Sequence, residues 1–262
     1  MDTVNTYGDK PFKIALLHGG PGAAGEMSYV AKKLSDKCNC GVLEPLQTSH
    51  SIKGQIKELH DQLTFMTNET IILAGYSWGA WLAWIFAAQH PELVKKIILI
   101  ASGPFTPEYA KNINRMRFDR MTDEQKIRAH EIEELLAENQ AESEELKEYG
   151  TIMLAADTYE RAIDVLDPIV DVDMSIYNGV WPNALKLRES GELLEMASKI
   201  RCPVIAIHGD YDAHPAAGVR IPLQDKIKDF TFNLLEKCGH TPWRETYAKD
   251  EFFRIMMEEF EQ

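Results

Sequence analysis

The chain has 262 residues, enough to bury a large core, and this length suits one α/β domain with an insertion. Its net charge of −13 would repel nucleic acids and anionic membrane surfaces, so neither is expected as a partner. The four cysteines lack zinc-site spacing, no apolar stretch is long enough to span a bilayer, and the first residues do not resemble a secretion signal. We therefore expect a cytoplasmic protein that holds no metal ion.

The first part of the chain alternates predicted strands and helices. Apolar runs at residues 11–17, 41–46 and 69–74 predict buried strands, and residues 25–37 and 51–66 have the apolar spacing of amphipathic helices. Residues 18–22 follow the first strand directly and read His-Gly-Gly-Pro-Gly. Such a loop can turn a bare backbone N–H toward a developing negative charge, as an oxyanion hole requires. It lacks the glycine spacing of nucleotide-binding loops, and a plain turn is the alternative interpretation.

Residues 75–79 read Gly-Tyr-Ser-Trp-Gly and lie between an apolar strand and a predicted helix over residues 78–90. In this strand–turn–helix context the motif exposes a serine hydroxyl at the C-terminal edge of a parallel sheet, and a Cβ at Gly75 or Gly79 would collide with neighbouring backbone. Ser77 is therefore the candidate nucleophile. Trp78 starts the helix, so its backbone N–H faces the place where an oxyanion would form. The alternative is a loop in which the glycines only end a strand.

The composition and the predicted secondary structure change after a further predicted strand at residues 94–101. Residues 105–199 are helix-rich, acidic around residues 131–148, and without the alternation typical of strands. This pattern predicts a helical cap, or lid, inserted into a core formed by residues 1–104 and 200–262. Residues 167–168 together with Tyr177, Trp181 and Pro182 are expected to form the irregular part of the cap.

Strands are again predicted at residues 202–207 and 230–235, before a closing helix at 244–260. The first of these leads into His-Gly-Asp-Tyr-Asp at residues 208–212, and the second into Cys-Gly-His at residues 238–240. Asp212 and His240 thus follow strand ends, as Ser77 does, and open parallel sheets collect functional groups at that edge. Asp210 is the other candidate acid, but we favour Asp212 because a side chain further round the loop can turn back toward the histidine.

These three residues have complementary chemistry. A serine hydroxyl needs a base to take its proton, and the base needs a carboxylate to hold its tautomer. The chain order Ser77, Asp212, His240 is that of the α/β-hydrolases, and it differs from the orders in chymotrypsin and subtilisin. The fold class expected is therefore α/β, with a mostly parallel central sheet, helices on both faces and an inserted helical lid.

At these motifs the sequence resembles the α/β-hydrolase superfamily, and in detail its proline iminopeptidase-like branch. The resemblance rests on residues 18–22, 75–79, 208–212 and 239–240. It implies a triad of Ser77, Asp212 and His240, oxyanion-hole N–H groups at Gly20 and Trp78, and no cofactor. Residues 43–49 depart from the Asp-Gln/Arg-Gly-x-Gly-x-Ser loop of that branch, and its opening hairpin looks truncated or missing here.

Three functions remain open from the sequence. We expect a serine hydrolase that cleaves a small ester or amide through an acyl-enzyme, with a small molecule or short peptide as substrate. An aminopeptidase of the proline iminopeptidase type is the alternative, in which acidic residues of the cap would bind the substrate ammonium group. A non-catalytic ligand-binding protein on the same fold is a third, disfavoured because a receptor needs no serine, aspartate and histidine set.

Overall fold

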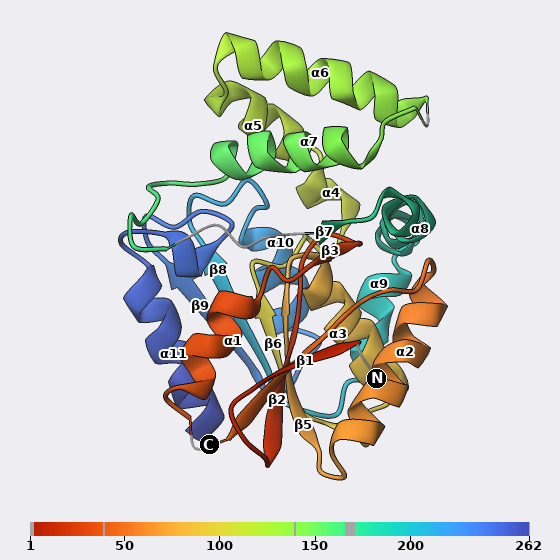
Figure 1. Cartoon of the computed structure of the whole chain (residues 1–262), viewed down its shortest axis with the longest axis vertical. Coiled ribbons are helices and arrows are strands. Elements are labelled where there is room, and N and C mark those ends of the chain that lie inside the picture. Colours follow the sequence, from red (N-terminus) through yellow and green to blue (C-terminus); the bar gives the residue numbers. More distant parts are fainter. Residues whose placement is uncertain (1–2, 39, 139, 166–170, 262) are drawn as a thin grey trace.

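Figure 1 shows the computed structural model, which describes residues 3–38, 40–138, 140–165 and 171–261. A seven-stranded sheet with the order β1-β4-β2-β5-β6-β8-β9 forms its centre. The strands are β1 Val4–Tyr7, β2 Phe12–Leu17, β4 Gly41–Pro45, β5 Ile71–Tyr76, β6 Val94–Ile100, β8 Val204–Gly209 and β9 Phe230–Leu235. Within this sheet every pairing is parallel except that of β1 with β4. The predicted α/β class and its six parallel strands are thus confirmed, whereas β1 was not predicted.

Helices cover both faces of this sheet (Figure 1). Side chains of α1 Ser28–Ser35 and α11 Lys249–Glu261 pack on one face, and those of α2 Ile52–Met66, α3 Trp78–Gln89 and α10 Ala217–Gln224 pack on the other. Successive strand residues point to opposite faces, so Leu73 lies against the α3 side while Ile72 and Ala74 lie against the α1 side. Both faces are therefore apolar, which explains why the parallel strands read as continuous hydrophobic runs.

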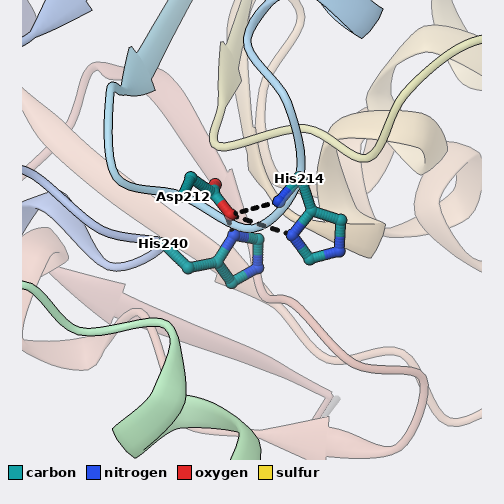
Figure 2. A group of neighbouring side chains, drawn as sticks. All are labelled: Asp212, His214 and His240. Atoms are coloured by element: carbon teal, nitrogen blue, oxygen red, sulfur yellow. Dashed lines mark hydrogen bonds and ion pairs between the residues drawn. The ribbon is translucent and has the colours of Figure 1, made fainter. Parts of the chain in front are cut away.

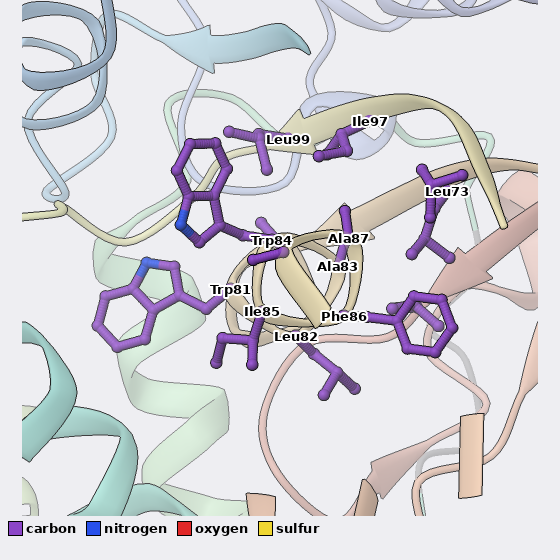
Figure 3. Close-up of a cluster of buried hydrophobic side chains, with 14 of the residues drawn as sticks. Leu73, Trp81, Leu82, Ala83, Trp84, Ile85, Phe86, Ala87, Ile97 and Leu99 are labelled. Carbon is purple, nitrogen blue, oxygen red and sulfur yellow. The ribbon is translucent and has the colours of Figure 1, made fainter. Parts of the chain in front are cut away.

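Helix α3 is the centre of the larger apolar cluster (Figure 3). Each residue from Trp78 to Ala88 is buried, as expected for a helix that is apolar all round. In Figure 3 the side chains of α3 radiate in every direction, and Leu73, Ile97 and Leu99 of β5 and β6 face it. The indole of Trp84 also donates a hydrogen bond to the Leu193 carbonyl at 2.8 Å. The serine at the start of α3 is consequently attached to a helix that is packed on all sides.

Helices form most of the chain between β6 and β8. They are α4 Pro107–Ala110, α5 Ile113–Arg120, α6 Asp123–Ala137, α7 Ser143–Ala156, α8 Met174–Ser190, α9 Glu192–Glu195 and the 3₁₀ helix η1 Met196–Lys199. In Figure 1, α5, α6 and α7 lie together as a layer beyond the sheet. Met121, Ala129 and Ile152 belong to a small apolar cluster that these helices enclose. This layer therefore has a core of its own.

Several expectations about local structure were wrong. Tyr177, Trp181 and Pro182 lie within α8 and are not irregular; Asp173 caps this helix by accepting hydrogen bonds from the Ser175 and Ile176 amides. Residues 167–168 lie outside the described residues. A two-residue strand β7 Asp171–Val172 pairs antiparallel with β3 Ala23–Ala24, and the closing helix begins at Lys249 after a 3₁₀ turn at Pro242–Arg244.

Candidate active site

Ser77 lies in a strained turn between β5 and α3. Its φ of 52° and ψ of −114° are rarely adopted by a residue with a side chain, and they cost on the order of 1–3 kcal/mol. The turn is held because the Ser77 N–H donates to the Ile100 carbonyl at 2.9 Å and the Ser77 carbonyl accepts from Ala80. A Cβ at Gly75 would meet the Gly79 carbonyl, and one at Gly79 would meet the carbonyl of Leu17. Both glycines are therefore required by close backbone approach.

His240 faces Ser77 from the loop after β9. Its Nε2 lies 3.1 Å from the Ser77 Oγ, and its Nδ1 lies 2.7 Å from Oδ2 of Asp212. The loop is fixed by the His240 N–H, which donates to the Asp157 carbonyl at 2.9 Å, and by the Gly239 N–H, which donates to the Glu245 carboxylate at 2.8 Å. Three side chains from distant parts of the chain thus form one hydrogen-bonded path.

Of the two candidate acids, Asp212 is the one beside His240. The Asp210 carboxylate instead accepts the Cys238 N–H at 3.1 Å and shapes the neighbouring turn. Burial alone would raise the pKa of Asp212, but His240 and His214 hold it well below its usual value. Burial likewise favours neutral His240, yet Asp212 raises its pKa above the ordinary histidine value. The pair therefore combines a carboxylate that stays ionised with a histidine that binds a proton readily.

Sequence reasoning missed a second histidine on this carboxylate. His214 donates from its backbone N–H and its ring to Oδ1 of Asp212, at 2.8 and 3.0 Å (Figure 2). Asp212, His214 and His240 offer ligand atoms that lie within 4.8 Å of one another, so this donor set could hold a metal ion. However, both carboxylate oxygens already accept histidine N–H groups. The same residues therefore fit a proton-transfer site without a metal.

The loop at residues 18–22 lies against the start of α3. The His18 ring bonds the Gly19 carbonyl through Nδ1 at 2.7 Å, and Gly20 has a φ of +35°. That carbonyl belongs to the same planar peptide as the Gly20 N–H, so the bond fixes the direction of this N–H as well. Trp78 is the first residue of α3, where an N–H has no acceptor within the helix. Both predicted oxyanion donors thus lie in segments with a defined backbone.

Gln47 links these two segments and was also missed. Its Nε2 donates to the His18 carbonyl at 3.0 Å, while its Oε1 accepts the Trp78 indole N–H at 2.8 Å. All three residues are buried. Gln47 stands where residues 43–49 depart from the family pattern, and that departure was the one available signal in the sequence.

Two further charged groups lie near His240. Glu26 accepts the Gly19 N–H at 3.0 Å, and burial, opposed by His240 and Arg244, raises its pKa to about 7. Asp157, at the end of α7, forms a buried ion pair with Arg117 of α5 at 2.5 Å. Its Oδ2 takes both Arg117 bonds, and within the described residues its Oδ1 has no hydrogen-bond partner. The helical layer therefore brings an acidic oxygen close to the candidate base.

Comparison with known proteins agrees with this arrangement. Residues 14–242 match the family model described as alpha/beta hydrolase fold. A proline iminopeptidase of Lactobacillus helveticus is 25% identical over 284 residues, covering 99% of this chain and 92% of that protein. The monoacylglycerol lipase abhd6-A of Xenopus laevis is 25% identical over 73% of this chain and 56% of its own length. The resemblance to the proline iminopeptidase branch is thus confirmed.

A solved structure of proline iminopeptidase from Mycobacterium smegmatis superposes with a TM-score of 0.67 at 15% identity, covering 99% of this chain and 94% of that one. Within the described residues, helices long and apolar enough to cross a membrane are absent. The family match covers residues 14–242, and this range includes Ser77, Asp212 and His240 of the hydrogen-bonded path. This chain therefore belongs to the alpha/beta hydrolase family.

Proposed function

We propose that this protein is a serine hydrolase that cleaves a small ester or amide, with Ser77 as nucleophile, His240 as base and Asp212 as orienting acid. The observation that carries the proposal is the path from the Asp212 carboxylate through His240 to the Ser77 hydroxyl, with separations of 2.7 and 3.1 Å. These are hydrogen-bond distances between groups of suitable chemistry. Relatives named as peptidase and lipase support hydrolysis as the reaction class.

In the proposed reaction His240 Nε2 takes the Ser77 proton while Oγ bonds to the acyl carbon. The charge on the substrate oxygen is received by the N–H groups of Gly20 and Trp78, each worth about 10²–10³ in turnover. The His240 imidazolium, stabilised by Asp212, then gives its proton to the leaving alcohol or amine. Water attacks the acyl-enzyme with the same histidine as base, which releases the acid and restores Ser77.

We further propose that residues 105–199 act as a cap over a core of residues 1–104 and 200–262. Two contacts support a functional link between the two parts. The Asp157 carbonyl accepts the His240 N–H, and the Glu245 carboxylate accepts the N–H groups of Tyr159 and Glu160. The proposed cap thus supplies bonds that hold the loop carrying the base.

The test is labelling with a fluorophosphonate, which reacts only with an activated serine. We expect wild-type protein to be labelled and Ser77→Ala to be silent. Ser102→Ala is a matched control, because Ser102 is buried after the adjacent strand β6 and its hydroxyl donates to a local carbonyl, that of Gly103. Unlabelled wild type, or equal labelling of Ser77→Ala, would refute the proposal and would favour a ligand-binding protein.

A second candidate function is removal of an amino-terminal residue from a short peptide. It is favoured by the relatives named as proline iminopeptidases and by the buried, unpartnered Oδ1 of Asp157, which could accept a substrate ammonium group. We would measure the hydrolysis of proline 4-nitroanilide and of 4-nitrophenyl esters by the wild type and by Asp157→Asn, a variant that keeps an oxygen for Arg117. If the protein is a peptidase, Asp157→Asn should lose activity on the anilide and keep its activity on the esters. An ester-only profile in the wild type would exclude this candidate.

A further inference from the structure

His214 makes an unusual set of contacts for a residue two places beyond the candidate acid. Its ring Nδ1 lies 3.0 Å and its backbone nitrogen 2.8 Å from the same oxygen, Oδ1 of Asp212 (Figure 2). Its ring also stacks on that of His240, with centroids 4.4 Å apart and planes inclined by 27°. The loop is fixed further because the His208 ring bonds the His214 carbonyl through Nε2 at 2.7 Å. His214 therefore touches both partners of the proposed charge pair.

The hydrogen-bond chemistry assigns the proton on the His214 ring. An ionised carboxylate only accepts hydrogen bonds, so Nδ1 of His214 must carry the hydrogen that points at Asp212. Burial, assisted by His240, lowers the pKa of His214 to about 4, so the ring stays neutral at ordinary pH. His214 thus donates to the carboxylate without adding a positive charge beside His240.

This contact has two consequences for His240. A bond to Oδ1 fixes the carboxylate plane, so that Oδ2 stays aimed at Nδ1 of His240. It also draws negative charge toward Oδ1 and leaves less on Oδ2 to stabilise an imidazolium. We propose that His214 is a positioning residue that fixes the Asp212 carboxylate and weakens its hold on the protonated form of His240. This inference rests on the proposed function for its catalytic meaning.

Other charged or titratable groups act on the same pair, and any change in titration must be read against them. They are His208 near the end of β8, Arg117 of α5, Asp157 at the end of α7 and Glu26 in the segment before α1. None of them is altered by a substitution at position 214. A shift that appears on changing His214 alone therefore reports the contacts of His214 itself, which are its bonds to Asp212 and its stacking on His240.

Two substitutions separate the hydrogen bond from the ring. His214→Phe keeps an aromatic ring for stacking and removes the Nδ1–H donor. His214→Asn removes the ring but retains an amide N–H where Nδ1 stands, since both atoms are attached to Cγ. The backbone N–H bond to Asp212 persists in both variants. The pair thus distinguishes a role for the donor from a role in packing.

The readouts are NMR titration of His240 in histidine-labelled protein and the pH profile of kcat/KM on a 4-nitrophenyl ester. In His214→Phe we expect the pKa of His240 to rise by about one unit, because Asp212 without the Nδ1–H donor stabilises the imidazolium more strongly. The acid limb of the pH profile should shift by the same amount. In His214→Asn both should remain near the wild-type values. An unchanged titration in His214→Phe, or the same shift in His214→Asn, would overturn the proposal.

A measurement on the unaltered protein keeps the proposal testable if a variant does not fold. The ¹⁵N shifts of His214 should report the Nδ1–H tautomer throughout neutral pH, and an Nε2–H tautomer would contradict the assigned donor. These titrations need no turnover. If His240 titrates in the variants as expected but the wild-type protein is not labelled by the fluorophosphonate, the serine hydrolase is refuted. If the wild-type protein is labelled but the pKa of His240 does not shift in His214→Phe, the role of His214 is refuted.

Discussion

Gln47 offers a sharp test of how this chain builds its oxyanion hole. Its amide joins the His18 carbonyl, in the loop that carries Gly20, to the indole of Trp78, whose backbone N–H is the second proposed donor. Gln47→Met keeps the length of the side chain and removes both hydrogen bonds. The carbonyl and the indole N–H would then stay buried without these partners.

The expected effect follows from those two lost bonds. A buried polar group left unpaired costs about 1–3 kcal/mol, so the stability loss should be about 2–6 kcal/mol. This is a large part of the roughly 5–15 kcal/mol that holds an ordinary domain folded. Turnover should fall by about 10- to 100-fold, less than for full loss of an oxyanion donor, because the N–H groups persist but are held less firmly.

Gln62→Met provides the matched control. Gln62 is also buried and also makes two bonds, to the carbonyls of Thr3 and Leu46, but it lies in α2 away from the hole. We would measure urea unfolding and steady-state turnover of a 4-nitrophenyl ester for both variants. Both should lose stability, and only Gln47→Met should lose kcat. Equal kcat values in the two variants would refute the role of Gln47 in aligning the hole.

Three more outcomes are expected. Because Asp212 raises the pKa of His240 and the base must be neutral, activity should be lost as pH falls through a midpoint above the ordinary histidine value; a profile flat through that region would contradict this. Arg117→Met should lower the free energy of unfolding by about 3–5 kcal/mol, because it leaves the Asp157 carboxylate buried without its ion-pair partner. Adding Asp157→Leu to this variant should restore most of the loss. An unchanged midpoint of urea unfolding in Arg117→Met would argue against the pair. Glu245→Gln should lower the melting temperature, since three backbone N–H groups share its carboxylate; an unaltered melt would mean that those bonds contribute little.

The sequence was informative wherever a residue's role depends on its immediate neighbours. The turn at Ser77 needs small residues two places before and after it, so Gly75 and Gly79 identify it in the sequence. The six parallel strands were predictable because a strand buried on both faces reads as an apolar run. By contrast, β1 was missed because its residues are only half-buried or exposed and it is recognised through its antiparallel pairing with β4.

The sequence by itself therefore determined the fold class, the turn that carries Ser77 and the chain order of the three candidate site residues. Tertiary structure decided which acid faces His240, how Gln47 joins two loops, and that His214 stacks on His240. The physical reason is the distance along the sequence over which each kind of interaction acts. Backbone strain and apolar periodicity act over a few residues, whereas these contacts join atoms that only folding brings within hydrogen-bond or stacking distance.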